Sequence, residues 1–176
     1  LGVAVSDETR LYTNAKKNIT ILNGIPQKEV QDFLSRQLMI ENVSSYLSYK
    51  NSHLTEWQFL KAVADEADCL ILLDINNIYV SAKNNGFSPQ AYLQGLETHR
   101  VAQFHLAGFE DKVTHFLDTH GADINPNVWN LYSAALAKFG PVATVIERDN
   151  AIPEFSVLHQ EAIYAQKIMD NYVNAA

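Results

Sequence analysis

Acidic and imidazole side chains directly follow four apolar segments of the sequence, and these residues are the best suited to chemistry. They are Glu41 after residues 38–40, Asp74 after 70–73, His105 after 101–104, and Glu147 after 142–146. Carboxylates packed together repel one another and are costly to remove from water unless a cation balances them. A mixed set of oxygen and nitrogen ligands suits iron, manganese or zinc better than calcium or magnesium. The four residues therefore predict a metal site if the fold brings them together.

Three further residues extend this set. Asn77 follows Asp74 by three residues, and Asp118 and His120 are separated by a single residue. In an extended segment, residues two apart lie on the same side of the chain, so Asp118 and His120 could bind one ion together. Each candidate also has a structural explanation, such as a helix cap, a turn, a core histidine or a surface ion pair. The metal hypothesis rests on the equivalent positions of four candidates at the ends of successive apolar segments.

The apolar segments alternate with amphipathic ones, which predicts strands joined by helices. Segment 69–73 is apolar throughout, as expected for a strand buried on both faces of a parallel sheet. We predict strands at 18–22, 38–40, 69–73, 101–106 and 142–146. We predict helices after Pro26, at 56–66, at 89–96, at 126–139 and at about 153–172. Thr55 is the expected N-cap of the second of these helices and Ser88 that of the third. Alternation of this kind indicates parallel strands, whose carboxyl-terminal ends share one edge. The candidate ligands are expected at that edge.

The size of the chain indicates part of a larger architecture. A (β/α) barrel of the TIM type typically needs ~250 residues, whereas this chain has 176. We interpret residues 1–176 as a single α/β domain that forms a partial (β/α) barrel lacking the first strands. An open doubly wound sheet is the alternative.

The composition limits the possible binding partners of the protein and its cellular compartment. The net charge of −7 argues against nucleic acid or an anionic membrane as the main partner. No stretch approaches the ~20 apolar residues of a membrane span, and residues 1–5 do not form a signal peptide. The single cysteine, Cys69, suits a reducing compartment. We therefore expect a cytoplasmic protein that does not span a membrane.

Six segments that contain these residues resemble the multinuclear non-haem iron-dependent oxygenases, a family that includes the methanobactin-biosynthesis oxygenase and was long catalogued as a domain of unknown function. The segments are IENVSSY (40–46), LLDINNIYVS (72–81), HLAG (105–108), LDTHG (117–121), VWNLY (128–132) and IERD (146–149). The resemblance runs from about Gln27 to Ala165. This stretch is similar to the carboxyl-terminal part of the family's (β/α) barrel, a fold of the xylose isomerase type.

The resemblance implies a site and an activity. By position, Glu41, Asp74, Asn77, His105, Asp118, His120 and Glu147 match metal ligand or site positions of the family, and we expect Glu41, Asp74 and His105 to be catalytic. The implied cofactor is two or three iron ions of mixed Fe(II)/Fe(III) state. The implied reaction is the dioxygen-dependent modification of cysteines in a ribosomally made precursor peptide, which a small partner protein delivers.

The chain also departs from the family pattern. Two further histidine ligands of the family precede the Glu41 segment, and Glu8 stands where one of them is expected. Phe109 stands where many members have a second histidine, and residues 1–25 match poorly overall. Two other classes therefore stay open: another divalent-metal barrel, such as a sugar isomerase or phosphodiester hydrolase using manganese or zinc, and a catalytically inactive remnant that acts as a scaffold.

Overall fold

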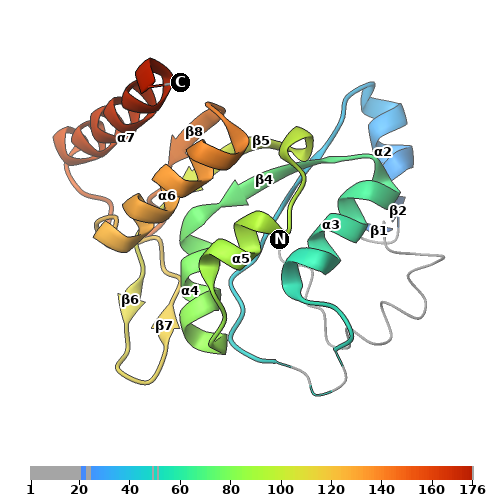
Figure 1. The fold of residues 1–176 in the computed structure, drawn as a ribbon, viewed down its shortest axis with the longest axis horizontal. Coiled ribbons are helices and arrows are strands. Elements are labelled where there is room, and N and C mark those ends of the chain that lie inside the picture. Colours follow the sequence, from blue (N-terminus) through green and yellow to red (C-terminus); the bar gives the residue numbers. More distant parts are fainter. Residues whose placement is uncertain (1–20, 23–24, 49, 51, 176) are drawn as a thin grey trace.

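A four-stranded parallel sheet forms the centre of the structure, a computed structural model that describes residues 21–22, 25–48, 50 and 52–175 (Figure 1). In order across the sheet, the strands are β3 (Met39–Glu41), β4 (Leu70–Asp74), β5 (Val101–Leu106) and β8 (Ala143–Ile146). All neighbouring pairs are parallel. The predicted α/β class with a parallel sheet is confirmed, and among the described residues the sheet does not close into a barrel.

Helices connect the strands. They are α2 (Gln27–Leu34), α3 (Glu56–Ala67), α4 (Ile75–Asn85), α5 (Pro89–Gln94), α6 (Pro126–Phe139) and α7 (Phe155–Ala175), with a 3-10 turn at Thr98–Arg100. Ser88 and Asn125 cap α5 and α6 with their side-chain oxygens, and a proline follows each cap. Gly140 ends α6 with a φ of 82°, which glycine adopts without strain. Across the described residues, we find no helix with the length and apolar character needed to cross a membrane.

The two faces of the sheet differ in what covers them. Figure 1 shows α3, α5 and α6 on one side of the sheet, and the side chains of Ile71, Leu73 and Phe104 on that face are buried. The strand register places Met39 and Val145 on the opposite face, where their exposed fractions are 44% and 40%. Within the described residues, the sheet is therefore covered by helices on one face only.

The described part of the first predicted strand is a strand, but it does not join the parallel sheet as expected, and residues 18–20 lie outside the described residues. Of residues 18–22 the structure describes Ile21–Leu22 (β1), which pair antiparallel with Ile25–Pro26 (β2) in a separate two-stranded sheet. Helix α2 begins at Gln27, directly after Pro26 as predicted. Phe33 of this helix is 88% exposed, so α2 does not bury this apolar side chain in the core.

Helix α4 is not predicted by the sequence, because Asn76 and Asn77 favour turns over helix interiors. The Asp74 side chain caps this helix by accepting a hydrogen bond from the Asn77 N–H at 2.7 Å. Residues 75–82 are all buried. Burial of the whole segment thus outweighs the weak helix propensity of the two asparagines.

A short antiparallel hairpin lies beside α4 and is likewise absent from the predicted elements. It pairs β6 (Glu110–Asp111) with β7 (Phe116–Leu117). The Asn84 side chain of α4 donates to the Phe116 carbonyl at 2.9 Å and accepts from the Phe116 N–H at 2.8 Å. These two hydrogen bonds fix the strand that leads directly into Asp118.

Thr55 forms the predicted N-cap of α3, and its loss should be measurable. The Thr55 hydroxyl accepts from the Gln58 N–H, and the Gln58 side chain accepts from the Thr55 N–H at 2.9 Å. We expect Thr55→Ala to lower the free energy of unfolding by about 1 kcal/mol in urea denaturation. Thr55→Ser keeps the hydroxyl and should retain most of the stability. Equal losses in the two variants would contradict the capping role.

Candidate metal centre

The four candidate ligands at the strand ends meet in space. Glu41, Asp74, His105 and Glu147 each offer one ligand atom, and these atoms all lie within 4.8 Å of one another. The register explains the convergence, since Asp74 pairs with His105 across β4 and β5. The Glu147 N–H donates to the Leu106 carbonyl at 2.9 Å, which brings the residue after β8 to the same edge. We refer to these four residues as the first ligand group.

A second ligand group lies next to the first and shares a residue with it. It consists of His120, Glu147 and Asp149. The Glu147 Oε2 atom lies 3.0 Å from His105 Nδ1 and 3.1 Å from His120 Nδ1, so one carboxylate oxygen contacts both imidazoles. Asp149 Oδ2 lies 3.4 Å from His120 Nδ1. The arrangement therefore offers two adjacent positions for a cation, with Glu147 between them.

Asp118 and His120 are in contact, but not for the predicted reason. Their Oδ1 and Nε2 atoms are 2.8 Å apart, while His120 has a φ of 47°, so the segment is not extended. The His120 carbonyl accepts the Asp149 N–H at 3.0 Å, which ties this turn to the residues after β8. The turn also approaches Gly108 closely, because a Cβ at Gly108 would lie 2.0 Å from the Ala122 carbonyl oxygen. A tight turn, and not strand geometry, brings the two side chains together.

Four buried side-chain oxygens in and beside the site have no hydrogen-bond partner among the described residues. Asp74 Oδ2, which lies 3.8 Å from His120 Nε2, and Asn77 Oδ1 belong to predicted ligand positions, and Asn76 Oδ1 and Thr119 Oγ1 are the other two. Buried acceptors are nearly always paired in folded proteins, and an unpaired one is costly. A bound cation would satisfy such acceptors, so the unpaired buried oxygens make these residues suitable ligands for a metal ion.

The electrostatics of the site show the cost of bringing these groups together. Burial raises the pKa of Glu41 despite the nearby His105, and burial raises the pKa of Asp74 well above its usual range. Burial alone would lower the pKa of His120, but the hydrogen bond to Asp118 and the charges of Asp74 and Asp118 raise it to about 9. Without a metal, protons therefore balance the excess of carboxylates.

The metal-free protein is expected to lose stability as the pH rises from 6.5 to about 9. The folded pKa of His120 lies above its ordinary value, so its stabilising contribution is complete below pH 6.5 and is lost as pH rises through about 9. Asp74 acts in the same direction, because its raised pKa disfavours the carboxylate in the folded state. Urea unfolding in the presence of a chelator measures this fall, and His120→Gln should reduce its size. A stability that stays constant over this range would contradict the assignment.

Comparison with known proteins identifies the family. The family model described as "RiPP precursor modification enzyme MbnB/TglH/ChrH" matches residues 19–170. The chain belongs to this family. The resemblance found in the sequence is thereby confirmed, and the match extends beyond residues 27–165 at both ends.

Several curated relatives of this chain are named UPF0276 proteins. One from Acaryochloris marina is 53% identical over 134 residues, which cover 76% of this chain and 49% of the relative. One from Anaeromyxobacter is 49% identical over 139 residues, covering 79% and 49%. One from Rhizorhabdus wittichii is 49% identical over 146 residues, covering 83% and 52%. The chain thus spans about half the length of these relatives.

One of the positions at which the chain departs from the family pattern, Phe109, lies in the described part of the chain. Phe109, at the position of a second family histidine, stacks on Phe116 with ring centroids 4.6 Å apart and packs near Tyr79. It joins the hairpin to α4 through packing and offers no ligand atom. Glu8 lies outside the described residues, so nothing can be added on that position.

Sequence reasoning missed two residues of the site. Asp149 belongs to the second ligand group, and its spacing of two from Glu147 was the available signal, since alternate residues of an extended segment share a side. Asn76 donates from Nδ2 to Asp118 Oδ1 at 2.8 Å. No pattern in the sequence distinguishes Asn76 from a turn residue, because its role depends on the position of the hairpin.

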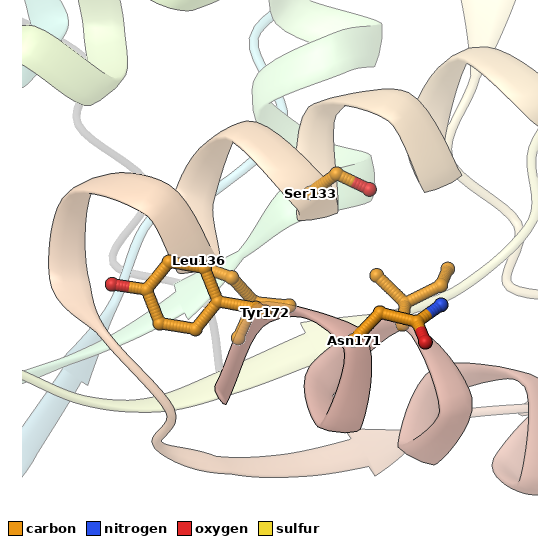
Figure 2. Close-up of a pocket in the computed structure, with 5 residues that line it drawn as sticks. Ser133, Leu136, Asn171 and Tyr172 are labelled. Carbon is orange, nitrogen blue, oxygen red and sulfur yellow. The ribbon is translucent and has the colours of Figure 1, made fainter. Parts of the chain in front are cut away.

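A pocket of about 350 Å³ lies elsewhere, between α6 and α7 (Figure 2). It is lined by Ser133 and Leu136 of α6 and by Ile168, Asn171 and Tyr172 of α7. None of these residues belongs to either ligand group, so the pocket is separate from the candidate metal centre.

Proposed function

We propose that the protein containing this chain is an iron- and dioxygen-dependent enzyme that oxidatively modifies cysteine residues of a ribosomally synthesised precursor peptide. The observation that carries the proposal is the pair of adjacent ligand groups joined by Glu147. Membership of a family described as precursor-peptide modification enzymes supports the class of substrate. A small partner protein that delivers the peptide is part of the same proposal.

Iron is the metal we propose for both ligand groups, as two or three ions of mixed Fe(II)/Fe(III) state. Glu41, Asp74, Asn77, His105 and Glu147 would hold one ion, and His120, Asp149 and Glu147 another. Asp118 contacts the opposite nitrogen of the His120 ring, and we assign it to the third ion of the proposed set. Oxygen-rich sets with imidazoles are typical of redox-active iron sites, although manganese and zinc accept similar ligands. Bound iron would supply the redox chemistry with dioxygen that protein side chains lack.

Glu41, Asp74 and His105 are the residues that we propose to act on the substrate. The Glu41 side chain is 40% exposed, whereas that of Asp74 is fully buried, so a peptide would reach the centre on the Glu41 side. The accessible Glu41 carboxylate is placed to accept the proton of an incoming thiol. His105 Nδ1 lies 3.7 Å from Glu41 Oε1, so the two side chains are neighbours at the proposed reaction centre.

We further propose that residues 1–176 form one domain and represent a partial (β/α) barrel that lacks the first strands. The support is the arrangement of the sheet, with helices on one face and partly exposed Met39 and Val145 on the other. In a closed barrel that second face would point inward and pack against the remaining strands.

Metal analysis combined with oxygen uptake tests the proposed function. We expect the purified protein, loaded with Fe(II) under anaerobic conditions, to consume dioxygen when a cysteine-containing precursor peptide is added. The same peptide with serine in place of cysteine serves as the control and should give no uptake. Tight zinc or manganese without oxygen uptake would instead favour a sugar isomerase or phosphodiester hydrolase. Less than one metal ion per chain after loading would favour an inactive scaffold.

A further inference from the structure

Asn42 directly follows Glu41, and its side chain joins the ends of two strands. The residue is only 3% exposed. The last backbone pair of β3 and β4 is Glu41 with Leu72, two residues before Asp74. Beyond that pair, Asn42 Oδ1 accepts the Asp74 N–H at 2.8 Å, and Asn42 Nδ2 donates to the Asp74 carbonyl at 2.9 Å. The side chain of Asn42 thus replaces the backbone pairing that the strands no longer make.

Asn77 closes this connection into a ring. Its Nδ2 donates to the Asn42 carbonyl at 3.0 Å, and its N–H donates to Asp74 Oδ1 at 2.7 Å. Three residues are therefore linked by four hydrogen bonds, all of them buried. We call Asn42, Asp74 and Asn77 the asparagine ring.

The asparagine ring determines which atoms remain free to bind a cation. It uses one carboxylate oxygen of Asp74 and leaves Oδ2 unpaired. It uses the amide nitrogen of Asn77, which orients the side chain and leaves Oδ1 unpaired. The unpaired side-chain oxygens of Asp74 and Asn77 are therefore the two that the ring does not use.

We propose that Asn42 is a positioning residue for the first ligand group, an inference that rests on the proposed metal centre. Asn42 fixes the distance between Glu41 and Asp74. Its carbonyl also holds the Asn77 side chain by its amide nitrogen, so that Asn77 Oδ1 stays free to bind the cation. Asn42 does so without adding charge to a cluster that already contains several carboxylates. Residues that orient metal ligands typically contribute ~10–100-fold to metal affinity.

The chemistry of the contact explains why an asparagine is required. Asp74 presents one N–H and one carbonyl, so its partner must accept with one atom and donate with another. An aspartate at position 42 has nearly the same shape, but it has no donor for the carbonyl and it adds a negative charge. Asn42→Asp therefore changes the hydrogen bonding and the charge while preserving the volume.

Gln31 provides a matched control at the opposite end of the same two strands. Its Nε2 donates to the Ala67 carbonyl at 2.8 Å, and its Oε1 accepts the Leu38 N–H at 2.9 Å. Leu38 precedes β3, and Ala67 lies shortly before β4. Gln31→Ala thus removes the same number and kind of hydrogen bonds as Asn42→Ala, far along the strands from the ligands.

The test titrates the wild type and the three variants Asn42→Ala, Asn42→Asp and Gln31→Ala with Mn(II) under anaerobic conditions, counting bound and free ions by electron paramagnetic resonance. We expect both Asn42 variants to bind the first ion ~10–100-fold more weakly than the wild type, while Gln31→Ala binds as the wild type does. Thermal unfolding of the metal-free proteins provides the second readout, and we expect Gln31→Ala and Asn42→Ala to lose similar stability. If Asn42→Ala does not fold, the near-isosteric Asn42→Asp carries the comparison.

Wild-type affinity in both Asn42 variants would overturn the inference and leave the proposed function standing. An equal loss of affinity in Gln31→Ala would also overturn it, because the effect would then follow stability alone. A wild-type protein that binds neither Mn(II) nor Fe(II) would overturn the proposed function and this inference with it.

Discussion

Replacing Glu147 by glutamine is expected to remove metal from both ligand groups at once. Glu147 is the one residue common to the two groups, and its Oε2 atom contacts His105 and His120 at 3.0 and 3.1 Å. An uncharged amide leaves the shape unchanged but removes the negative charge between two cations. We expect the affinity for Fe(II) to fall by more than the ~10–100-fold typical of residues that only support ligands.

Elemental analysis after anaerobic loading measures this loss, and Glu66→Gln is the matched control. Glu66 is an exposed residue of α3 and belongs to neither ligand group. Its substitution makes the same change in net charge and should leave the metal content as in the wild type. A Glu147→Gln protein that retains one ion of two would show that the groups bind independently.

Replacing Phe104 by alanine is expected to lower the free energy of unfolding by about 3–5 kcal/mol, because the substitution leaves a cavity in the core. Phe104 lies in the middle of the sheet and is fully buried. Its ring meets Tyr132 and Phe139 of α6 edge-on, with centroids 5.8 and 6.2 Å apart. The substitution would weaken the contact between the sheet and α6, one residue before the proposed ligand His105.

Urea denaturation measures this change, and Phe33→Ala provides the comparison. Phe33 is 88% exposed, so the same chemical change there should alter stability by no more than about 0.5 kcal/mol. Phe104→Leu should fall between the wild type and Phe104→Ala, since it refills part of the cavity. Similar losses at positions 33 and 104 would contradict the observed placement of the core.

The sequence predicted well those elements whose local and tertiary preferences agree. Strand β5 and helix α6 have the predicted bounds, because apolar residues predominate in β5 and Asn125 and Gly140 mark the ends of α6. Helix α4 was not predicted, since its asparagines favour turns and only burial in the finished fold makes it helical. The helix propensity of the segment by itself contains no information about that burial.

The site could be predicted to a similar degree. Glu41, Asp74, His105 and Glu147 were recognisable because parallel strands bring their ends to one edge whatever the loops between them. The turn at His120, the contact of Asn76 with Asp118 and the asparagine ring depend on distances between loops that lie far apart in the chain. Such distances are set by packing and leave no periodic pattern in the sequence.

The shared oxygen of Glu147 has a consequence for how the protein fills with ions. An ion in either position would hold the carboxylate in place and so prepare it for the neighbouring position. Binding at the two positions would then be thermodynamically linked, because the first ion orders the shared carboxylate but also neutralises part of its charge. A metal titration should therefore depart from the curve expected for two independent sites.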